Sequence, residues 1–543
     1  MQTPSFLRIG TLAALLLGPT ACVKDLDREP FYEVNTDTVY RDPANYLRVL
    51  AKLYAGFNLA GQTSTGSADV SDFGDEGEAS YLRAYWKLQQ LPTDETVVAW
   101  NNVPIQDLNK ISWNAGNNYV LFAYNRIFYE VSLCNEFIRE TTDDKLSRRG
   151  ITGPAAANAR RYRAEARFLR ALAYFHALDL FGTVPFVTEA DAPGKFLPRQ
   201  IARADLFAYL ETELTALEAD LGAPRQPGYG HADQGAAWTL LATLYLNAEV
   251  YTGTPRYTDC LTYCNKVLAA GYTLAPEYRL LFLADNDRVA ATEIIFPITS
   301  DGLAQQSYGG TTYLVHAAVG GRMLSTGFGV NSGWAGNRSR RNLPQLFPAV
   351  NGSVDRRAMF FTVGQTLDIP APSANNPAPL IAFTSGYAVT KYKNKTAAGA
   401  NGSDAVFVDT DFPMFRLADV YLMYAEAVLR GGTGGTPGQA LTYVNALRDR
   451  AYGNPAGGTA GHVVAADLAA PDFILDERAR ELYWEGHRRT DLIRFGKFTA
   501  GSYLWPYKGG APAGQGVAAT FNLYPIPSAD IVANPTLVQN PGY

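Results

Sequence analysis

The 543-residue sequence is poor in charge, histidine and long apolar runs. Only 18% of its residues are charged, and 47 Lys plus Arg against 52 Asp plus Glu give a formal net charge of −5. That balance excludes a nucleic-acid-binding protein that works through bulk positive charge. Beyond the N-terminus the chain lacks an apolar run of about 18 residues, which excludes a helical membrane bundle.

The N-terminus has the pattern of a bacterial export signal. A short apolar stretch, Leu12 to Leu17, follows Arg8 and precedes Thr20-Ala21-Cys22. This stretch is too short to span a membrane, so we expect residues 1–21 to be a signal peptide. Thr20-Ala21-Cys22 looks like a lipobox, although Pro19 stands where Leu is usual, and Cys22 is then the acylated lipid anchor. The alternative, ordinary cleavage near Ala21, would leave an exposed unpaired thiol.

The remaining residues offer little for metal or cofactor chemistry. Cys260 and Cys264 lie four apart on an expected helix, but nothing at nearby spacing completes a tetrahedral metal set. We expect them to be small buried apolar residues. The five histidines are scattered, and neither a phosphate-binding glycine loop nor a Gly-x-Ser-x-Gly elbow occurs. We therefore expect no metal, no cofactor and no catalytic residue.

Helical periodicity predicts the fold class. Phe168, Ala171, Leu172, Phe175 and Leu178 form one apolar stripe with a 3.6-residue repeat. Comparable stripes predict an all-α dominated fold of four tetratricopeptide-like helix pairs: residues 42–57 with 119–140, 158–181 with 204–221, 237–248 with 255–270, and 412–429 with 436–451. Their uneven spacing excludes a simple tandem array.

Long insertions interrupt the helix pairs. Residues 60–118 and 299–410 are rich in Gly, Ser, Asp and Asn, and the second contains short β-prone segments. Aromatic residues in both argue against disorder. We expect a single body over residues 22–543, with helix pairs at about 42–298 and 412–500, these two loop-rich insertions, minor β content and an extended tail at 521–543.

Several segments together resemble the SusD/RagB family. They are Ala164–Ala171 with Phe181–Pro185, Glu293–Phe296, Arg416–Ala427, Glu477–Leu482, Glu485–Arg489 with Asp491–Arg494, and Tyr524–Pro527 with Asn534-Pro535 and Gln539–Tyr543. The resemblance implies a SusD-like fold and a lipoprotein on the exterior of a Bacteroidetes-type outer membrane. It further implies a non-catalytic protein that captures an oligosaccharide, or in some members a peptide, and passes it to a TonB-dependent SusC-like transporter.

The charged run near the C-terminus has a structural interpretation. Glu481, Glu485, Arg488, Asp491 and Arg494 alternate acid and base at helical spacing. We expect buried or half-buried ion pairs that hold the last helices on the bundle. Acid–base catalysis is the alternative interpretation of such carboxylates.

Aromatic and amide residues in the first insertion are candidates for sugar contact. A sugar needs a ring on which its apolar face stacks, and polar neighbours for its hydroxyls. Trp100, Asn102 and Trp113 follow the acidic pair Asp94-Glu95. Starch-binding family members place stacking aromatics after such a pair, which makes Trp100 the leading candidate by analogy. Packing of a loop tryptophan beneath the helices is the alternative.

The second insertion adds Tyr308, Tyr313 and Trp334. Glycines beside Tyr308 and Trp334 favour rings that project from the loop. The acidic loop at residues 69–78 lacks the spacing of a calcium-binding EF-hand and is expected to be solvated. Three functions remain open: glycan capture, peptide capture through an edge strand, and glycoside hydrolysis, which needs two carboxylates beside the aromatic surface.

Overall fold

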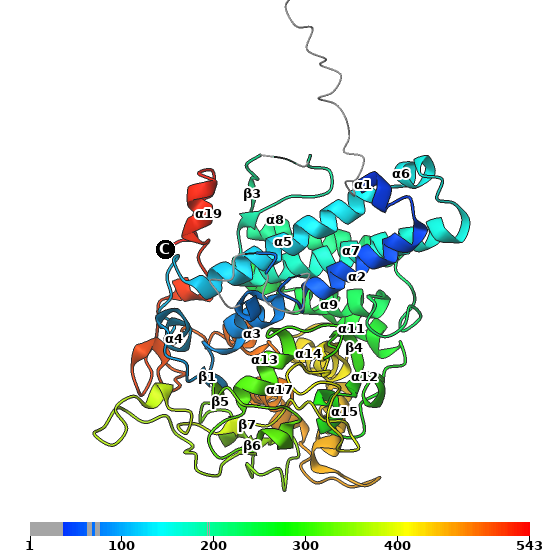
Figure 1. Ribbon diagram of the computed structural model, residues 1–543. Coiled ribbons are helices and arrows are strands. Elements are labelled where there is room, and N and C mark those ends of the chain that lie inside the picture. Colours follow the sequence, from blue (N-terminus) through cyan, green and yellow to red (C-terminus); the bar gives the residue numbers. More distant parts are fainter. Residues whose placement is uncertain (1–35, 62–67, 71–75, 193, 195) are drawn as a thin grey trace, which may run out of the picture.

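The structure is a computed structural model that describes residues 36–543 except 62–67, 71–75, 193 and 195 (Figure 1). The expected signal peptide and Cys22 lie outside the described residues. None of the described helices combines the length and apolar character needed to cross a bilayer.

Eight helices of the described residues form a layer of four pairs. Consecutive members pack against one another, and α11 joins the last pair through α14. The helix-dominated fold class expected from the periodicity is confirmed. The pairs are α2 (Pro43–Gly56) with α5 (Asn118–Glu140), α7 (Gly153–Leu180) with α8 (Arg203–Leu217), α9 (Gln234–Leu246) with α11 (Tyr257–Leu268), and α14 (Leu417–Leu429) with α15 (Pro437–Tyr452).

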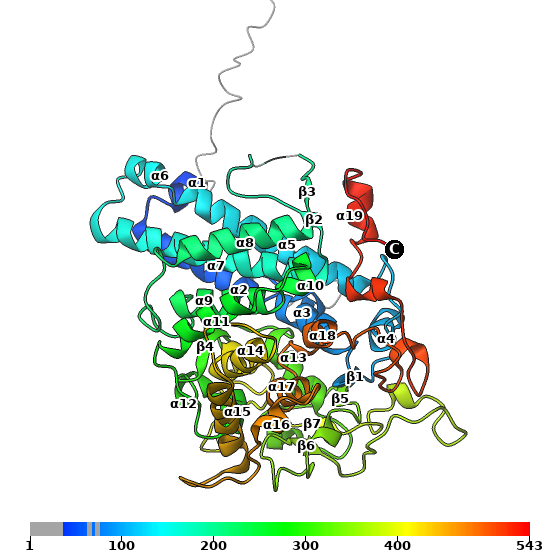
Figure 2. The same cartoon turned by 180° about the vertical axis from the view of Figure 1, so that it is seen from behind.

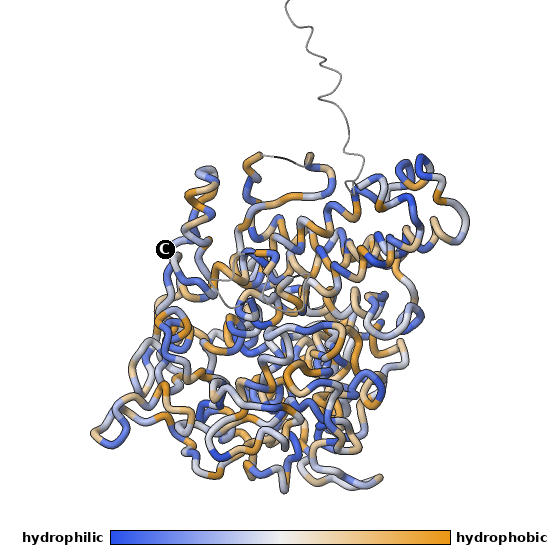
Figure 3. Tube along the Cα trace, in the orientation of Figure 1, coloured by the Kyte–Doolittle hydropathy of each residue, from blue (hydrophilic) through white to orange (hydrophobic). Residues whose placement is uncertain are grey.

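Local sequence explains where these helices begin and end. The apolar stripe of α7 is buried, and Gly182 follows the helix in the left-handed conformation at φ 75°. The Asp233 side chain caps α9, and Thr436 caps α15 by accepting from the Gln439 amide. Polar and apolar positions both occur along the helices of the layer in Figure 3, but nearly all residues of α9 and of the C-terminal half of α7 are buried.

One expected helix begins later than its periodicity suggested. Residues Phe412–Arg416 form strand β8, which pairs antiparallel with β4 (Ile294–Ile298), and the helix starts at Leu417. All residues of both strands are buried. Pro413 disfavours the helical conformation of the preceding residue, Phe412, and pairing with β4 satisfies the backbone instead.

The two insertions contain structure of their own and lie together below α2, α5, α7 and α8 and beside α14 in Figures 1 and 2. The first holds the buried helix α3 (Tyr81–Gln90), strand β1 (Thr96–Val98) and helix α4 (Val103–Lys110); the second holds α13 (Gly310–Ala318) and β5 (Asn337–Ser339). Further elements are α1 (Thr36–Val39), α6 (Asp143–Arg148), α10 (Ala248–Thr252), α12 (Asn286–Val289), α16 (Ala465–Leu468), α19 (Ser528–Ala533), β2 (Val184–Pro185) with β3 (Gln200–Ile201), and β6 (Phe360–Phe361) with β7 (Ala388–Val389).

The C-terminal charged run forms the expected buried ion pairs. It lies on α17 (Phe473–Leu482), α18 (Arg488–Arg494) and the turn between them. Arg416 pairs with Glu481 and Glu485 at 2.7 Å, and Arg494 pairs with Asp491 at 2.6 Å. The pairs of Arg416 attach the end of α17 and the following turn to β8. The pair of Arg494 with Asp491 lies within α18, and Arg494 joins this helix to α14 through Glu426 at 2.7 Å.

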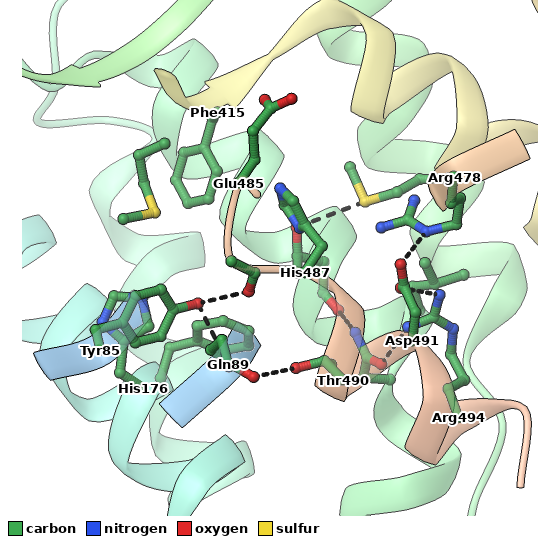
Figure 4. Close-up of a pocket in the computed structure, with 17 residues that line it drawn as sticks. Tyr85, Gln89, His176, Phe415, Arg478, Glu485, His487, Thr490, Asp491 and Arg494 are labelled. Atoms are coloured by element: carbon green, nitrogen blue, oxygen red, sulfur yellow. Dashed lines mark hydrogen bonds and ion pairs between the residues drawn. The ribbon is translucent and has the colours of Figure 1, made fainter. Parts of the chain in front are cut away.

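Beside α18 the core encloses a small cavity of about 30 Å³ (Figure 4). His176, Tyr85 and Gln89 face it from one side, and His487 and Thr490 from the other. Burial lowers the pKa of His176 to about 3, so this histidine is neutral at physiological pH. The cavity belongs to the packing between α3, α7 and α18.

The three described cysteines are buried free thiols, among them Cys260 and Cys264, as expected.

Candidate functional site

A short antiparallel strand pair brings the two insertions together. Val98 of β1 stands opposite Asn337 of β5, and the Ala99 amide donates to the Gly336 carbonyl at 2.9 Å. Trp100 follows β1 directly, and Trp334 lies just before β5. The Trp100 indole Nε1 donates to the Trp334 carbonyl at 3.1 Å, across 234 residues of sequence.

Tyr308 reaches the same place from the turn before α13. Its ring centroid lies 6.2 Å from that of Trp334, with 56° between the ring planes. Gly310 makes this turn possible, because its φ is +51° and a Cβ there would lie 1.8 Å from Asn58 Oδ1. Phe407 supports Tyr308 at a centroid distance of 5.2 Å.

Trp100, Tyr308 and Trp334, together with Glu78 and Arg83, line a cavity of about 440 Å³, which we call the ring pocket. All three rings are half-buried, so each offers part of its surface to a ligand. The aromatic residues come from loops, while Arg83 comes from the rigid helix α3. Three of the six expected contact residues thus converge on one cavity.

The polar wall of the ring pocket is an ion-paired cluster. Arg83 donates from Nη1 to the Tyr308 carbonyl at 3.0 Å and from Nη2 to Glu78, which also pairs with Lys87. The Arg83 guanidinium lies 5.6 Å from the Trp100 ring centroid and 5.8 Å from that of Trp334. Burial alone would raise the pKa of Glu78, but Arg83 and Lys87 outweigh it and lower that pKa, so Glu78 is a carboxylate.

Tyr313 supports the ring pocket from behind instead of lining it. It lies on α13, is fully buried, and donates its hydroxyl to Asn337 Oδ1 at 3.0 Å. Its ring packs 5.9 Å from Trp100 and 4.7 Å from the Arg83 guanidinium. Helical packing explains this placement, which corrects the expectation of direct contact.

Trp113 also lies apart from the ring pocket. It is 2% exposed, its ring centroid lies 4.5 Å from that of Tyr524, and it donates Nε1 to the Tyr543 hydroxyl at 2.9 Å. The C-terminal tail covers this side chain, a contact from residues more than four hundred positions away. Trp113 is therefore a packing residue, which corrects its assignment to the binding surface.

Asn102 is exposed and caps helix α4. Its Oδ1 accepts from the Ile105 amide and from the Tyr119 hydroxyl, both at 3.1 Å. Capping occupies the oxygen of this amide, and the ring pocket does not include it.

The acidic pair Asp94-Glu95 faces the core. Arg488 donates to both oxygens of Asp94, at 2.7 and 2.6 Å, and Glu95 accepts from the Trp484 amide at 3.3 Å. Both carboxyls are buried. Burial raises the pKa of Glu95 to about 8. The pair that marks the loop in sequence is thus structural.

Sequence reasoning missed Glu78, Arg83 and Lys87. A signal was present, because Arg83 and Lys87 are four residues apart and therefore share one face of α3. The described residues contain no group of three His, Cys, Asp or Glu side chains that could hold a metal ion. Of the acidic loop, Asp72 and Asp75 lie outside the described residues, while Asp69 pairs with Lys52 at 2.6 Å.

Comparison with known proteins gives consistent similarities. A SusD family profile matches residues 265–543. Starch-binding protein SusD of Bacteroides thetaiotaomicron is 35% identical, over 98% of this chain and 97% of that protein. SusD-like protein P2 of Formosa agariphila is 25% identical over 74% of this chain and 78% of its own length. Among solved structures, surface glycan-binding protein A of Bacteroides thetaiotaomicron in complex with laminarihexaose superposes with a TM-score of 0.67 at 20% identity, covering 92% of this chain and 99% of that chain.

Proposed function

The chain belongs to the SusD family, and from this premise we propose that it captures an oligosaccharide in the ring pocket without cleaving it. The observation that carries this proposal is the convergence of Trp100, Tyr308 and Trp334, from two separate insertions, on one cavity with an arginine and a carboxylate. The starch-binding relative and the laminarihexaose complex support a saccharide as ligand.

The chemistry of the ring pocket suits a neutral sugar chain. Half-exposed indole and phenol rings provide stacking surfaces for apolar sugar faces, and loops on a rigid scaffold hold them in place. The ion pair between Arg83 and Glu78 holds a hydrogen-bond donor and a hydrogen-bond acceptor near the rings. Most of the positive charge of Arg83 is balanced locally.

Hydrolysis is disfavoured by the same geometry. A glycosidase needs two carboxyl groups on either side of the scissile bond. Among the residues that line the ring pocket, Glu78 alone carries a carboxyl group, and two cations hold it ionised. Asp94 and Glu95 are buried against Arg488. We therefore propose binding as the activity.

We further propose the setting that the family implies. Cys22 carries the lipid that anchors the protein on the exterior of the outer membrane, and a TonB-dependent SusC-like transporter receives the captured ligand. Peptide capture remains the alternative ligand class, and the binding experiment below separates it from saccharide capture.

Replacement of the rings tests the proposal. We expect Trp100→Ala and Trp334→Ala each to raise the Kd for the bound oligosaccharide about 2- to 12-fold, because a stacking ring contributes about 0.5–1.5 kcal/mol. Isothermal titration calorimetry with starch-, laminarin- and xylan-derived oligosaccharides and with a mixed peptide set, on protein lacking residues 1–22, measures the effect. Phe196→Ala, an exposed ring at 46%, is the matched control.

Three results would contradict the proposal. Release of reducing ends from a bound oligosaccharide would show an enzyme. Unchanged affinity in both tryptophan variants, with binding still present, would show that the ligand occupies another surface. Binding of peptides alone would replace the saccharide by the alternative ligand class.

A further inference from the structure

The surface of α7 between Arg160 and Arg167 carries a second recess. Arg160, Arg161, Arg163 and Arg167 line it together with Asp220 and Gln226, from the segment after α8, and it encloses about 620 Å³. We call it the arginine groove. It shares no lining residue with the ring pocket. The start of α7 lies at the end of the helical layer near α6 and α1, whereas the ring pocket lies beside α3 and α13 (Figures 1 and 2).

Helical spacing gathers these arginines. Arg160, Arg163 and Arg167 follow at i, i+3 and i+7 and so share one face of α7, and Arg161 borders that face. The opposite wall carries Gln226 and Pro227, with small residues on the floor between the helices. Guanidinium groups from two turns of one helix therefore face a common space.

Carboxylates accept hydrogen bonds from only some of the nitrogens of these arginines. Arg167 binds Glu213 through two hydrogen bonds, at 2.9 and 3.0 Å, and pairs with Asp220 at 2.9 Å. Arg160 donates to Asp143 at 3.0 Å through Nε, and the described residues give its two terminal nitrogens no hydrogen-bond acceptor. Arg167 is thus fixed, while Arg160 keeps donors for a ligand.

Arg161 is the least satisfied of the four. The nearest carboxylate oxygen, Oε1 of Glu165, lies 3.8 Å from its Nε, beyond hydrogen-bond distance. That Nε is buried without a hydrogen-bond partner among the described residues. Glu165 accepts from the Tyr54 hydroxyl at 2.6 Å and contacts His231 at 2.8 Å through Oε2, so its Oε1 faces Arg161 Nε without a hydrogen bond. The terminal nitrogens of Arg161 have no hydrogen-bond acceptor among the described residues, and they are the donors that a ligand could use.

Arginine forks match oxyanions by charge and by geometry, and they remain charged at every accessible pH. The volume of the groove exceeds that of an inorganic anion, so the anion would be one group of a larger molecule. We propose that the arginine groove binds a sulfate or phosphate ester through Arg160 and Arg161, with Arg163 beside them and Arg167 held in place by Glu213. This inference does not rest on the function proposed for the ring pocket.

Charge removal tests the inference. Arg160→Gln/Arg161→Gln removes two side chains that are 52% and 40% exposed, so the fold should persist, and near-ultraviolet circular dichroism checks it. Three probes are titrated: inorganic sulfate, a sulfated oligosaccharide beside its unsulfated form, and phosphatidylcholine vesicles with and without phosphatidylglycerol. The sulfated oligosaccharide reports a saccharide ester, and the anionic vesicles report a lipid headgroup.

We expect wild-type protein to bind at least one ester probe in preference to its uncharged counterpart, and the double variant to lose at least about tenfold in affinity, since charge-assisted hydrogen bonds to two forks are removed. Arg288→Gln, 72% exposed on α12, removes a positive charge outside the arginine groove and should leave binding unchanged. Absence of binding to every probe, or equal loss in the Arg288 control, would overturn the inference.

Discussion

At the scale of single residues, the ring pocket depends on a position without a side chain. An added Cβ at Gly336 would lie 2.9 Å from Cε2 of the Trp100 indole. Glycine therefore lets the Trp100 ring lie flat against the backbone that precedes β5. This close contact fixes the position of the Trp100 ring in the ring pocket.

We expect Gly336→Ala to weaken oligosaccharide binding about 10-fold while the protein remains folded. The added methyl group displaces the indole of Trp100, and the displaced ring loses its contacts with the ligand. Calorimetric titration measures the affinity, and Trp fluorescence reports the displaced ring. Gly327→Ala is the matched control, since a Cβ there meets nothing within 4 Å. Equal affinity in both variants would contradict this account of the Trp100 position.

The sequence predicted some residues of the ring pocket but not all of them. Glycines beside Tyr308 and Trp334 favoured projecting rings, and the structure places both rings half-buried on the ring pocket. Trp113 has the same kind of sequence context, yet Tyr524 and Tyr543 cover it. Local context therefore does not distinguish a loop aromatic that stays open from one that a distant segment covers.

At the scale of elements, α17 is fixed by charge. Arg357 donates to Glu477 at 2.9 Å and to Glu481 at 3.2 Å, and Arg416 and Arg450 also pair with Glu481. All these groups are buried. Three cations around one carboxylate compensate for its loss of hydration, and they join α17 to β8, to α15 and to the second insertion.

Removal of one charged group from this buried ion-pair network should therefore lower the stability of the fold. We expect Glu481→Gln to lower the free energy of unfolding by about 3–5 kcal/mol, because three buried arginines lose their shared partner. Urea denaturation followed by circular dichroism measures the change. The control Glu277→Gln, an exposed residue paired with Arg279, should change stability by less than about 1 kcal/mol. Similar effects in both variants would show that the buried network contributes no more than a surface pair.

At the scale of the whole molecule, the same ion-pair network makes the free energy of unfolding depend on pH in the acidic range. Burial alone would raise the pKa of Glu477, but Arg357, Arg480 and Arg448 outweigh it and lower that pKa from 4.5 to about 2. The pKa values of Glu481 and Asp491 are likewise lowered by neighbouring arginines despite burial. Unfolded chains take up these protons at higher pH than the folded protein does.

We therefore expect stability from these carboxylates to be complete above pH 4.5 and to fall as the pH decreases toward about 2. Melting temperatures across this interval, recorded by circular dichroism, measure the loss. Glu477→Gln should show a shallower slope than wild type, since one titrating group is gone. A melting temperature that stays constant from pH 4.5 to 2 would contradict the assignment of these ion pairs as stabilising carboxylates.

The sequence by itself determined the helix pairs, the family and the general chemistry of the insertions. Helical periodicity is a local property, so the stripes of α7 and α9 predict their own burial. Tertiary structure alone decided which insertion residues share a cavity. The register of β1 on β5 joins Trp100 to Trp334, and α3 brings Arg83 between them. Such neighbours are set by long-range packing and backbone pairing, which no local pattern encodes.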